Sequence, residues 1–422
     1  MTLKVQYNWD TGKKTVADLG QWQDAYSYLE EAHASPDGET LAAIVKNQDM
    51  EFTVIQQKIG QEITAWENGF DKIWNLTFGG DGRISALVSD VGEWTVATDD
   101  LTWENTFDFV WDLTISQDGK NLAVAAQKDL KYIAIKNDLP WENHFSRLTQ
   151  MILSPDASCT AAIVETEQIL ESEIFKFRKG CYSIGMEGKA WKTSFMNVWD
   201  PVFSKDSKHT AATIRTSYSD YTIAVNGKPW DSAFSSAWAP QFSPVDNSVT
   251  APVKKGGKWF LAKDGAIFWD KPFAQLWHHV HAENYNSTGA IAAPEFGLWT
   301  VVLDGQPWDI TFSEYVTDLV MGPQKGQAAC AFKEKGRWGI AVNGLAWQDN
   351  YDMAWKPVFS PDGTMAAAKV EHKGLYQIVV NGKPLDGQYT RLANPIFSPN
   401  GKKLLIRGIE KETYIREVVE VA

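Results

Sequence analysis

Short apolar segments recur along the whole chain, and turn signals separate each segment from the next. Residues 221–225 (Tyr-Thr-Ile-Ala-Val) alternate between polar and apolar side chains, which is the pattern of a half-buried strand. Other segments, such as 41–45, 161–164 and 211–214, are rich in alanine and aliphatic residues. Because these segments are short and are bounded by Gly, Pro, Asn and Asp, they predict strands, and the chain as a whole predicts an all-β fold.

The order of segments repeats about every 38–39 residues, and aromatic residues mark the repeat. Successive members of a first tryptophan series are 44, 37, 38, 50, 39, 39, 39, 39 and 38 residues apart. These members are Trp22, Trp66, Trp103, Trp141, Trp191, Trp230, Trp269, Trp308 and Trp347, with Leu385 in the tenth place. Four residues after each member lies one of the +4 aromatics, Tyr26, Phe70, Phe107, Phe145, Phe195, Phe234, Phe273, Phe312, Tyr351 and Tyr389. Eight residues after the first series, six repeats carry a second tryptophan series, Trp74, Trp111, Trp199, Trp238, Trp277 and Trp355.

Two kinds of turn divide each repeat into strands. Ser-Pro-Asp-Gly at 35–38 and 360–363 precedes an alanine-rich segment, and Asn-Gly at 226–227 and 343–344 precedes the first-series Trp. Pro fixes φ for a turn, and Asn, Asp and Gly tolerate the positive φ of tight connections. Each repeat is therefore predicted to hold four short strands in roughly 40 residues, which is typical of one blade of a β-propeller.

The repeats predict how the blades hold together. One blade cannot bury its aromatic side chains alone, but neighbouring blades can bury them mutually. We therefore interpret the first tryptophan series and the +4 phenylalanines as repeat-packing aromatics, and the alanines as residues that fit the narrow inner part of a ring. On this interpretation, Trp230→Ala or Trp347→Ala costs roughly 3–5 kcal/mol of folding free energy.

The sequence thus predicts residues 1–422 as a single β-propeller array of about ten degenerate repeats, arranged in one large ring. Two smaller propellers, or fewer blades with longer loops, are the alternatives. Residues 3–19 are predicted to form an extra N-terminal hairpin that pairs with the C-terminal strand near 414–421. The spacing of 50 marks a loop insertion at 165–180, with Glu165, Glu167, Glu171 and Glu173, which is either a binding element or a solvated decoration.

Charge and composition narrow the partners. The formal net charge of −13 argues against nucleic acid and against an anionic membrane surface. No stretch approaches 18 apolar residues, so we expect no direct membrane insertion, and a cytoplasmic location. Cys159, Cys181 and Cys330 are widely spaced, and we interpret them as buried apolar residues in a reducing compartment.

Candidate chemistry is sparse. His279 and His281 would share one side of a strand and are weak candidates for metal ligands, but they align with core positions of other repeats and no third ligand is evident. The chain has no phosphate-binding loop, no His-Glu-x-x-His and no Gly-x-Ser-x-Gly. We therefore expect no catalytic residues, no cofactor and no enzyme activity.

The motif Trp-x-x-x-Phe-x-x-x-Trp, as at 230–238, departs from the WD40 signature although the Ser-Pro-Asp-Gly turns are WD40-like. In its tryptophan density, acidity and length the chain resembles the TmcD family, the tryptophan-rich subunits of the Tmc transmembrane redox (tetrahaem cytochrome) complexes of sulfate-reducing bacteria. The resemblance implies a cytoplasmic accessory subunit, peripheral to the inner membrane. Its partners would be an iron–sulfur subunit, a cytochrome b subunit and a multihaem cytochrome.

The sequence therefore predicts a non-catalytic scaffold that binds partner subunits of a membrane-associated electron-transfer complex through one propeller face. Two alternatives place a site at the central channel: a propeller enzyme (hydrolase or lyase) and a small-molecule sensor.

Overall fold

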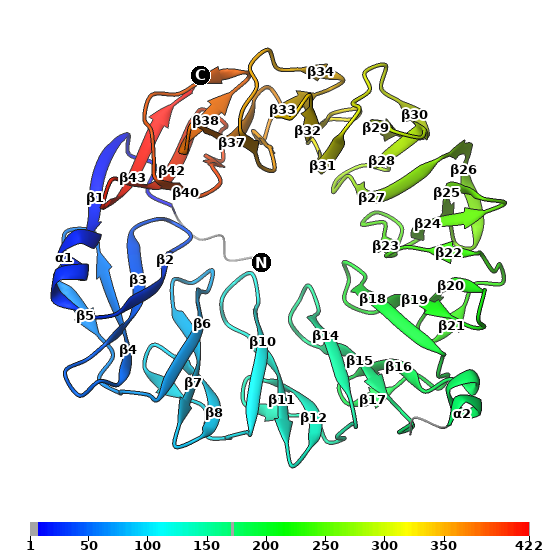
Figure 1. The fold of residues 1–422 in the computed structure, drawn as a ribbon, viewed down its shortest axis with the longest axis horizontal. Coiled ribbons are helices and arrows are strands. Elements are labelled where there is room, and N and C mark those ends of the chain that lie inside the picture. The colour runs from blue at the N-terminus through cyan, green and yellow to red at the C-terminus, as the bar shows by residue number, and fades with distance from the viewer. Residues whose placement is uncertain (1–6, 170–172, 422) are drawn as a thin grey trace.

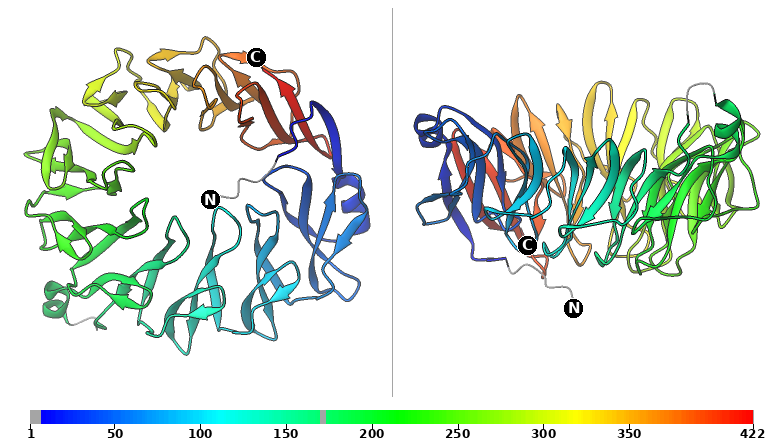
Figure 2. Two further views of the ribbon diagram at one scale, coloured as in Figure 1. Left: turned by 180° about the vertical axis from the view of Figure 1, so that it is seen from behind. Right: turned by 90° about the horizontal axis from the view of Figure 1, so that it is seen from below.

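A computed structural model describes residues 7–169 and 173–421, and these residues form ten antiparallel sheets arranged around one axis (Figure 1). Each sheet is one blade, with its first strand nearest the axis and its last strand at the rim. The views from behind and from the side show the same single ring (Figure 2). The predicted all-β propeller is confirmed, with ten blades in one ring.

Blades 1 to 5 have four strands each, and they follow the chain in order. Blade 1 is β2 (Leu29–Ala34), β3 (Thr40–Lys46), β4 (Phe52–Lys58) and β5 (Ile63–Ala65). Blade 2 is β6 (Lys72–Phe78), β7 (Ile84–Asp90), β8 (Glu93–Thr98) and β9 (Leu101–Thr102). Blade 3 is β10 (Phe109–Ile115), β11 (Leu122–Lys128), β12 (Lys131–Lys136) and β13 (Leu139–Pro140). Blade 4 is β14 (Leu148–Leu153), β15 (Thr160–Glu165), β16 (Tyr182–Met186) and β17 (Lys189–Ala190). Blade 5 is β18 (Asn197–Phe203), β19 (Thr210–Arg215), β20 (Tyr221–Val225) and β21 (Lys228–Pro229).

Blades 6, 9 and 10 have their first strand divided into two pieces. Blade 6 is β22 (Ser236–Ala237), β23 (Gln241–Phe242), β24 (Val249–Lys255), β25 (Lys258–Lys263) and β26 (Ala266–Phe273). Blade 7 is β27 (Gln275–His281), β28 (Thr288–Glu295), β29 (Leu298–Leu303) and β30 (Gln306–Pro307). Blade 8 is β31 (Tyr315–Met321), β32 (Ala328–Glu334), β33 (Arg337–Val342) and β34 (Leu345–Ala346). Blade 9 is β35 (Met353–Ala354), β36 (Val358–Phe359), β37 (Ala366–His372), β38 (Leu375–Val380) and β39 (Lys383–Pro384). Blade 10 is β40 (Arg391–Leu392), β41 (Ile396–Phe397), β42 (Lys403–Glu410), β43 (Thr413–Glu420) and the N-terminal β1 (Gly12–Asp18).

The N-terminal strand closes the ring. β1 pairs with β43 from Gly12 opposite Val418 to Asp18 opposite Thr413, and the short helix α1 (Leu19–Ala25) follows it. The predicted pairing of this region with the C-terminal strand is confirmed. The predicted hairpin is wrong for the described part of 3–19, because β1 is a single strand; residues 3–6 lie outside the described residues. The physical reason is that β43 would otherwise present an unpaired sheet edge, which β1 occupies.

Cationic side chains reinforce this closure. Arg416 is 2% exposed, and its Nε donates a hydrogen bond to the Asp37 carbonyl at 2.8 Å. Arg407 Nη1 donates to the Pro36 carbonyl at 3.0 Å, in the same turn of blade 1. Because a guanidinium carries five donors and no acceptor, backbone carbonyls suit it well. Blade 10 thus holds blade 1 by polar contacts as well as by packing.

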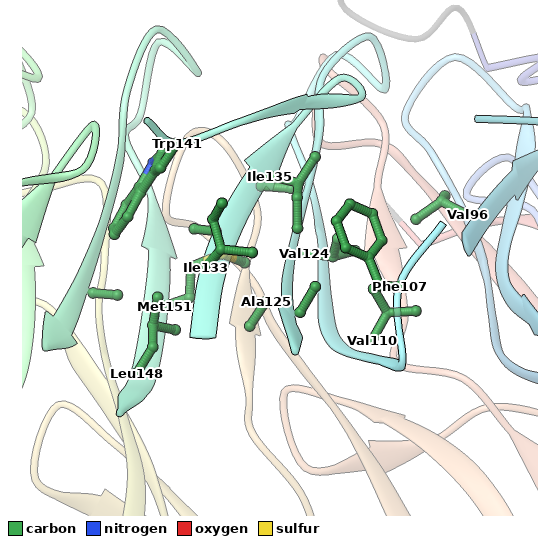
Figure 3. Packing of buried hydrophobic residues seen from close by; sticks show 14 of the residues in the cluster. Val96, Phe107, Val110, Val124, Ala125, Ile133, Ile135, Trp141, Leu148 and Met151 are labelled. Atoms are coloured by element: carbon green, nitrogen blue, oxygen red, sulfur yellow. The ribbon is translucent and has the colours of Figure 1, made fainter. Parts of the chain in front are cut away.

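The core lies between successive blades. One cluster contains Phe107, Val124, Ile133, Trp141 and Leu148 from neighbouring sheets (Figure 3). The alanine-rich segments form second strands of blades, such as β3, β15, β19 and β37, and their alanines are buried. The expectation that these alanines lie in the narrow inner part of the ring is thus corrected: the first strand lies nearest the axis, and the alanines lie on the second strand (Figure 1). The second strand is packed between neighbouring sheets, which favours small side chains.

Candidate functional site

The first tryptophan series lies where the outermost strand of a blade ends. The backbone N–H of Trp66 donates to the Val54 carbonyl at 2.9 Å, and that of Trp141 donates to Ala134 at 3.0 Å, so each residue extends its own sheet. Trp66, Trp141 and Trp269 are at most 6% exposed. Trp103, Trp191, Trp230, Trp308 and Trp347 are half-buried, and Trp22 is buried in α1.

Apart from Tyr26, which caps α1, the +4 aromatics pair with the aromatic residue at the start of the third strand of the same blade. Phe107 and Trp94 exchange two backbone hydrogen bonds of 2.8 and 2.9 Å, and Phe195 and Phe312 form equivalent bridges. All +4 aromatics are buried except Tyr26 and Phe145, which are half-buried. The +4 positions thus fix the connection between one blade and the next.

The second tryptophan series occupies a different environment. Its members lie at or next to the start of the first strand, and Trp74 is 37% and Trp238 is 52% exposed. Trp74 and Trp238 are therefore exposed, whereas Trp111, Trp199, Trp277 and Trp355 are half-buried, and Trp111 and Trp277 also pack against the cores between blades. The first strand begins at one face of the propeller, so a large aromatic side chain at the start of this strand is partly exposed on that face.

Each second-series ring packs on the aromatic residue that opens the third strand. Because neighbouring strands are antiparallel, the first and third strands begin at the same end of the sheet. The ring centroids are 6.1 Å apart for Trp74 and Trp94, and 5.6 Å apart for Trp238 and Trp259. We call this surface the aromatic face, and its paired rings are Trp74–Trp94, Trp111–Tyr132, Trp199–Tyr221, Trp238–Trp259, Trp277–Trp299 and Trp355–Tyr376.

Hairpin tips add apolar side chains to the aromatic face. The hairpins between second and third strands turn at this end of the sheets, and they expose Met50 (62%), Val91 (86%), Leu130 (80%) and Phe296 (90%). Exposed apolar side chains collected on one surface are typical of an interaction site, whereas isolated ones are ordinary. The aromatic face therefore has the composition of a binding surface.

Lysines border the aromatic face. Lys369 Nζ lies 4.3 Å from the ring centroid of Trp355, and Lys254 Nζ lies 5.8 Å from that of Trp259. Burial lowers the pKa of Lys369. These cation–π contacts hold the rings in place and keep a polar border around the apolar surface.

A groove on the aromatic face crosses blades 6, 7 and 8. It has a volume of about 340 Å³. The centroid of Trp277 is 5.9 Å from those of both Trp299 and Tyr315. No charged side chain lines the groove within the described part of the chain, and the lining side chains are Trp238, Gln275, Trp277, Phe296, Trp299 and Tyr315.

The insertion at 165–180 lies in the hairpin between β15 and β16, hence on the aromatic face. It contains the short helix α2 (Ile174–Lys179), where Ile174 is 54% and Phe175 is 74% exposed. Glu165 accepts a hydrogen bond from Ser146 at 2.8 Å, and Glu173 pairs with Lys176 at 2.7 Å. Glu167 is exposed, and Glu171 lies outside the described residues.

The two candidate metal ligands, His279 and His281, have different surroundings. His279 is 2% exposed, and its ring centroid is 5.9 Å from that of His281. His281 exchanges hydrogen bonds with the hydroxyls of Thr250 and Thr288 at 2.8 and 3.0 Å. Burial and the neighbouring His281 lower the pKa of His279 to about 3, and burial lowers that of His281 to about 4. Residues 7–169 and 173–421 contain no group of three metal-ligating side chains.

The innermost strands carry polar residues at β-bulges. Asp112 and Asp200 adopt φ of 55° and 51°, and burial raises the pKa of both carboxyl groups. Gln150 Oε1 accepts a hydrogen bond from the Asp200 backbone at 2.9 Å, and Glu31 Oε2 accepts one from Leu76 at 2.6 Å. At these two sites the polar groups connect neighbouring blades.

The cysteines are separate from these features. Cys181 and Cys330 are buried, and Cys159 is half-buried, contrary to the expectation for that residue. Burial raises the pKa of Cys181 to about 11 and raises that of Cys330 further, so both are protonated thiols at neutral pH.

Comparison with known proteins finds likenesses among solved structures only. No family model and no curated protein matches the chain. Among solved structures, the chain is similar to the Dos1 propeller, with 10% identity over 97% of this chain and 95% of that one, and a TM-score of 0.36. It is also similar to the β-propeller domain of the Trilobed protease from Pyrococcus furiosus (14%, covering 66% and 96%, TM-score 0.31) and to a eukaryotic initiation factor (11%, covering 78% and 90%, TM-score 0.47). These likenesses carry no functional inference.

The helices of the described residues are α1 and α2, and neither has the length and apolar character needed to cross a membrane.

The sequence and the structure thus point to different residues. The residues named from the sequence are mostly buried between blades, whereas the aromatic face is formed by the second tryptophan series, the rings that open the third strands, and the hairpin tips. The Trp at the start of a first strand was the sequence signal for this surface. Its exposure depends on where the strand begins in the ring.

Proposed function

We propose that this protein is a non-catalytic scaffold that binds partner proteins through the aromatic face of its propeller. One observation carries this proposal: large apolar side chains of the second tryptophan series and of the hairpin tips are exposed together on one face. Trp238 is 52% exposed and Phe296 is 90% exposed. Trp and Tyr are the residues that contribute most to protein–protein affinity, because they supply large rigid contact areas.

The first partners to test are subunits of a membrane-associated electron-transfer complex, namely an iron–sulfur subunit and a cytochrome b subunit. The support is the resemblance of the tryptophan motif to the tryptophan-rich subunits of such complexes. In this proposal the protein is cytoplasmic, is held at the inner membrane by its partners, and contributes contacts rather than electron carriers.

Co-purification tests this proposal. Tagged full-length protein is purified from its native host as the wild type, as the aromatic-face variant Trp74→Ser/Trp238→Ser, and as the control variant Leu101→Ser/Leu139→Ser. The control residues are 77% and 72% exposed, and they lie at the opposite ends of the sheets. We expect the aromatic-face variant to lose its partners and the control to keep them. Equal recovery of the same partners with all three proteins contradicts the proposal.

A deletion tests the role of the insertion separately. Replacing residues 167–180 by a short Gly-Ser turn removes Ile174 and Phe175 from the aromatic face. If the insertion is part of the contact, this variant recovers less partner than the wild type. Unchanged recovery shows that the insertion is a decoration, and the rest of the aromatic face then carries the proposal.

A further inference from the structure

The groove across blades 6 to 8 has an uncharged lining among the described residues. Trp277 is its centre: Trp299 and Tyr315 pack on it with interplanar angles of 45° and 69°. The rings therefore do not form one flat stack, and the spaces between tilted rings are open to a ligand. Phe296 and Trp238, which are both highly exposed, also line the groove.

The groove offers more hydrogen-bond donors than acceptors. An indole N–H can only donate, whereas the Tyr315 hydroxyl and the Gln275 amide can do both. No hydrogen bond in the described part of the chain uses the Tyr315 hydroxyl, the Gln275 side chain, or the indole N–H groups of Trp238 and Trp299. A ligand that presents carbonyl acceptors and few N–H groups therefore complements this lining.

A proline-rich segment has this chemistry. Proline has no backbone N–H, and a polyproline II helix has no internal hydrogen bonds, so its carbonyls remain available to donors. Its apolar rings fit between aromatic side chains, and it is already extended, so little conformational entropy is lost on binding.

The same features disfavour two other ligands. Sugar hydroxyls donate hydrogen bonds as well as accepting them, and no carboxylate lines the groove to accept them. A cationic ligand would find no carboxylate in the lining to pair with. Lys254, which lies over Trp259, the ring stacked on Trp238, adds a positive charge beside the groove, and like charges repel.

We propose that the groove formed by Trp238, Trp277, Trp299 and Tyr315 binds an uncharged proline-rich segment of a partner protein in the polyproline II conformation. This inference rests on the proposed scaffold function, because it names the class of partner segment that the aromatic face recognises.

The test is a titration of full-length protein with a decaproline peptide, followed by tryptophan fluorescence and by calorimetry. A Gly-Ser peptide of equal length is the control ligand. The protein variants are Trp238→Ala and Tyr315→Ala, and the control variant is Phe268→Ala. Phe268 is 48% exposed in blade 6 and lies outside the aromatic face, near the turn that joins β25 and β26. Circular dichroism and the melting temperature establish that each variant folds.

We expect saturable binding of decaproline to the wild type and to Phe268→Ala, and at least tenfold weaker binding to Trp238→Ala and Tyr315→Ala. The Gly-Ser peptide should not bind. The inference is overturned if decaproline does not bind the wild type, or if the groove variants bind it as well as the wild type does. It is also overturned if a neutral oligosaccharide or tetramethylammonium binds the groove and decaproline does not.

The co-purification experiment separates this inference from the proposed function. If aromatic-face variants lose their partners but decaproline does not bind, the partner segment is of another class and the scaffold proposal stands. If decaproline binds the groove but the aromatic-face variants keep all partners, the scaffold proposal is contradicted, and what remains is that the groove binds polyproline without its serving the recovered partners.

Discussion

Trp66 and Trp74 lie eight residues apart in one repeat, yet they have opposite environments. Trp66 is 6% exposed at the end of β5, and packs with Phe70 and Ile73 between blades 1 and 2. Trp74 is 37% exposed at the start of β6, where it packs on Trp94 and Phe109 at the surface. Tryptophan recurring with the same period thus packs between blades at one position and is partly exposed at the other.

The difference comes from the geometry of a blade. The end of the outermost strand leads directly into the next blade, so a large side chain there lies between two sheets. The start of the innermost strand lies at an open end of the sheet, where no neighbouring element covers it. A periodic aromatic residue therefore indicates a position that every blade uses, but how deeply the side chain is buried depends on which end of which strand it occupies.

The largest expected effect is on stability, from the buried member of this pair. Trp66→Ala should lower the free energy of unfolding by about 3–5 kcal/mol, because it leaves a cavity between two blades. Trp74→Ala, the matched control, should cost less, about 1 kcal/mol, since 37% of the residue is already exposed. Denaturant unfolding followed by circular dichroism measures both. Equal costs would show that the two environments are energetically the same.

The same reasoning corrects the values expected for Trp230 and Trp347. Both are half-buried at their strand ends, so truncation of either should cost less than that of Trp66. The fully buried members of the first series cannot be recognised from their spacing, because burial depends on how far each neighbouring blade covers the ring.

Much of the fold could be predicted from local chemistry. The Ser-Pro-Asp-Gly turn works as its residues suggest: Ser35 Oγ donates to Asp37 at 2.5 Å and accepts from the Thr40 backbone at 3.0 Å. The Asn-Gly turn is equally local, with Asn226 at a φ of 50° and its side chain accepting from Thr210 at 2.9 Å. Such contacts lie within one repeat, so the repeat pattern reveals them.

The groove could not be predicted in the same way. Trp238, Trp277 and Tyr315 belong to three different blades, and they meet only because the ring places the starts of their first strands side by side. The closure of blade 10 by β1 also depends on a distant contact, between Gly12 and Val418; here the sequence predicted the pairing with the C-terminal strand, but not that a single strand makes it. Periodicity identifies the members of such sites without showing which of them are uncovered.

A second comparison lies within β27, where Trp277 is on the aromatic face and His279 is buried. The unfolded chain protonates His279 near pH 6.5, whereas the pKa in the folded protein is about 3. Below pH 6.5 the unfolded state binds a proton that the folded state does not, so stability falls as the pH falls. Between pH 7.5 and 5 we expect a loss on the order of 2 kcal/mol from this residue.

Variants separate His279 from its neighbours. His279→Leu should flatten the fall in unfolding free energy between pH 7.5 and 5, and the exposed His278→Leu should not. His281 contributes with the same sign, because its pKa is also lowered, so some dependence remains in His279→Leu. The lowered pKa values of Asp156 and Asp246 act below about pH 4, outside this window. An unchanged slope in His279→Leu would mean that water reaches this ring.

The smallest effect on stability is expected at the most exposed member of the second series. Trp238→Ser should change the free energy of unfolding by no more than about 0.5 kcal/mol, because 52% of the residue is already exposed and its main partner, Trp259, is held by Lys254. Acrylamide quenching of tryptophan fluorescence should fall in this variant and stay unchanged in Trp66→Phe, since the quencher reaches only exposed indoles. A large loss of stability in Trp238→Ser would place this residue with the packing aromatics and remove it from the binding surface.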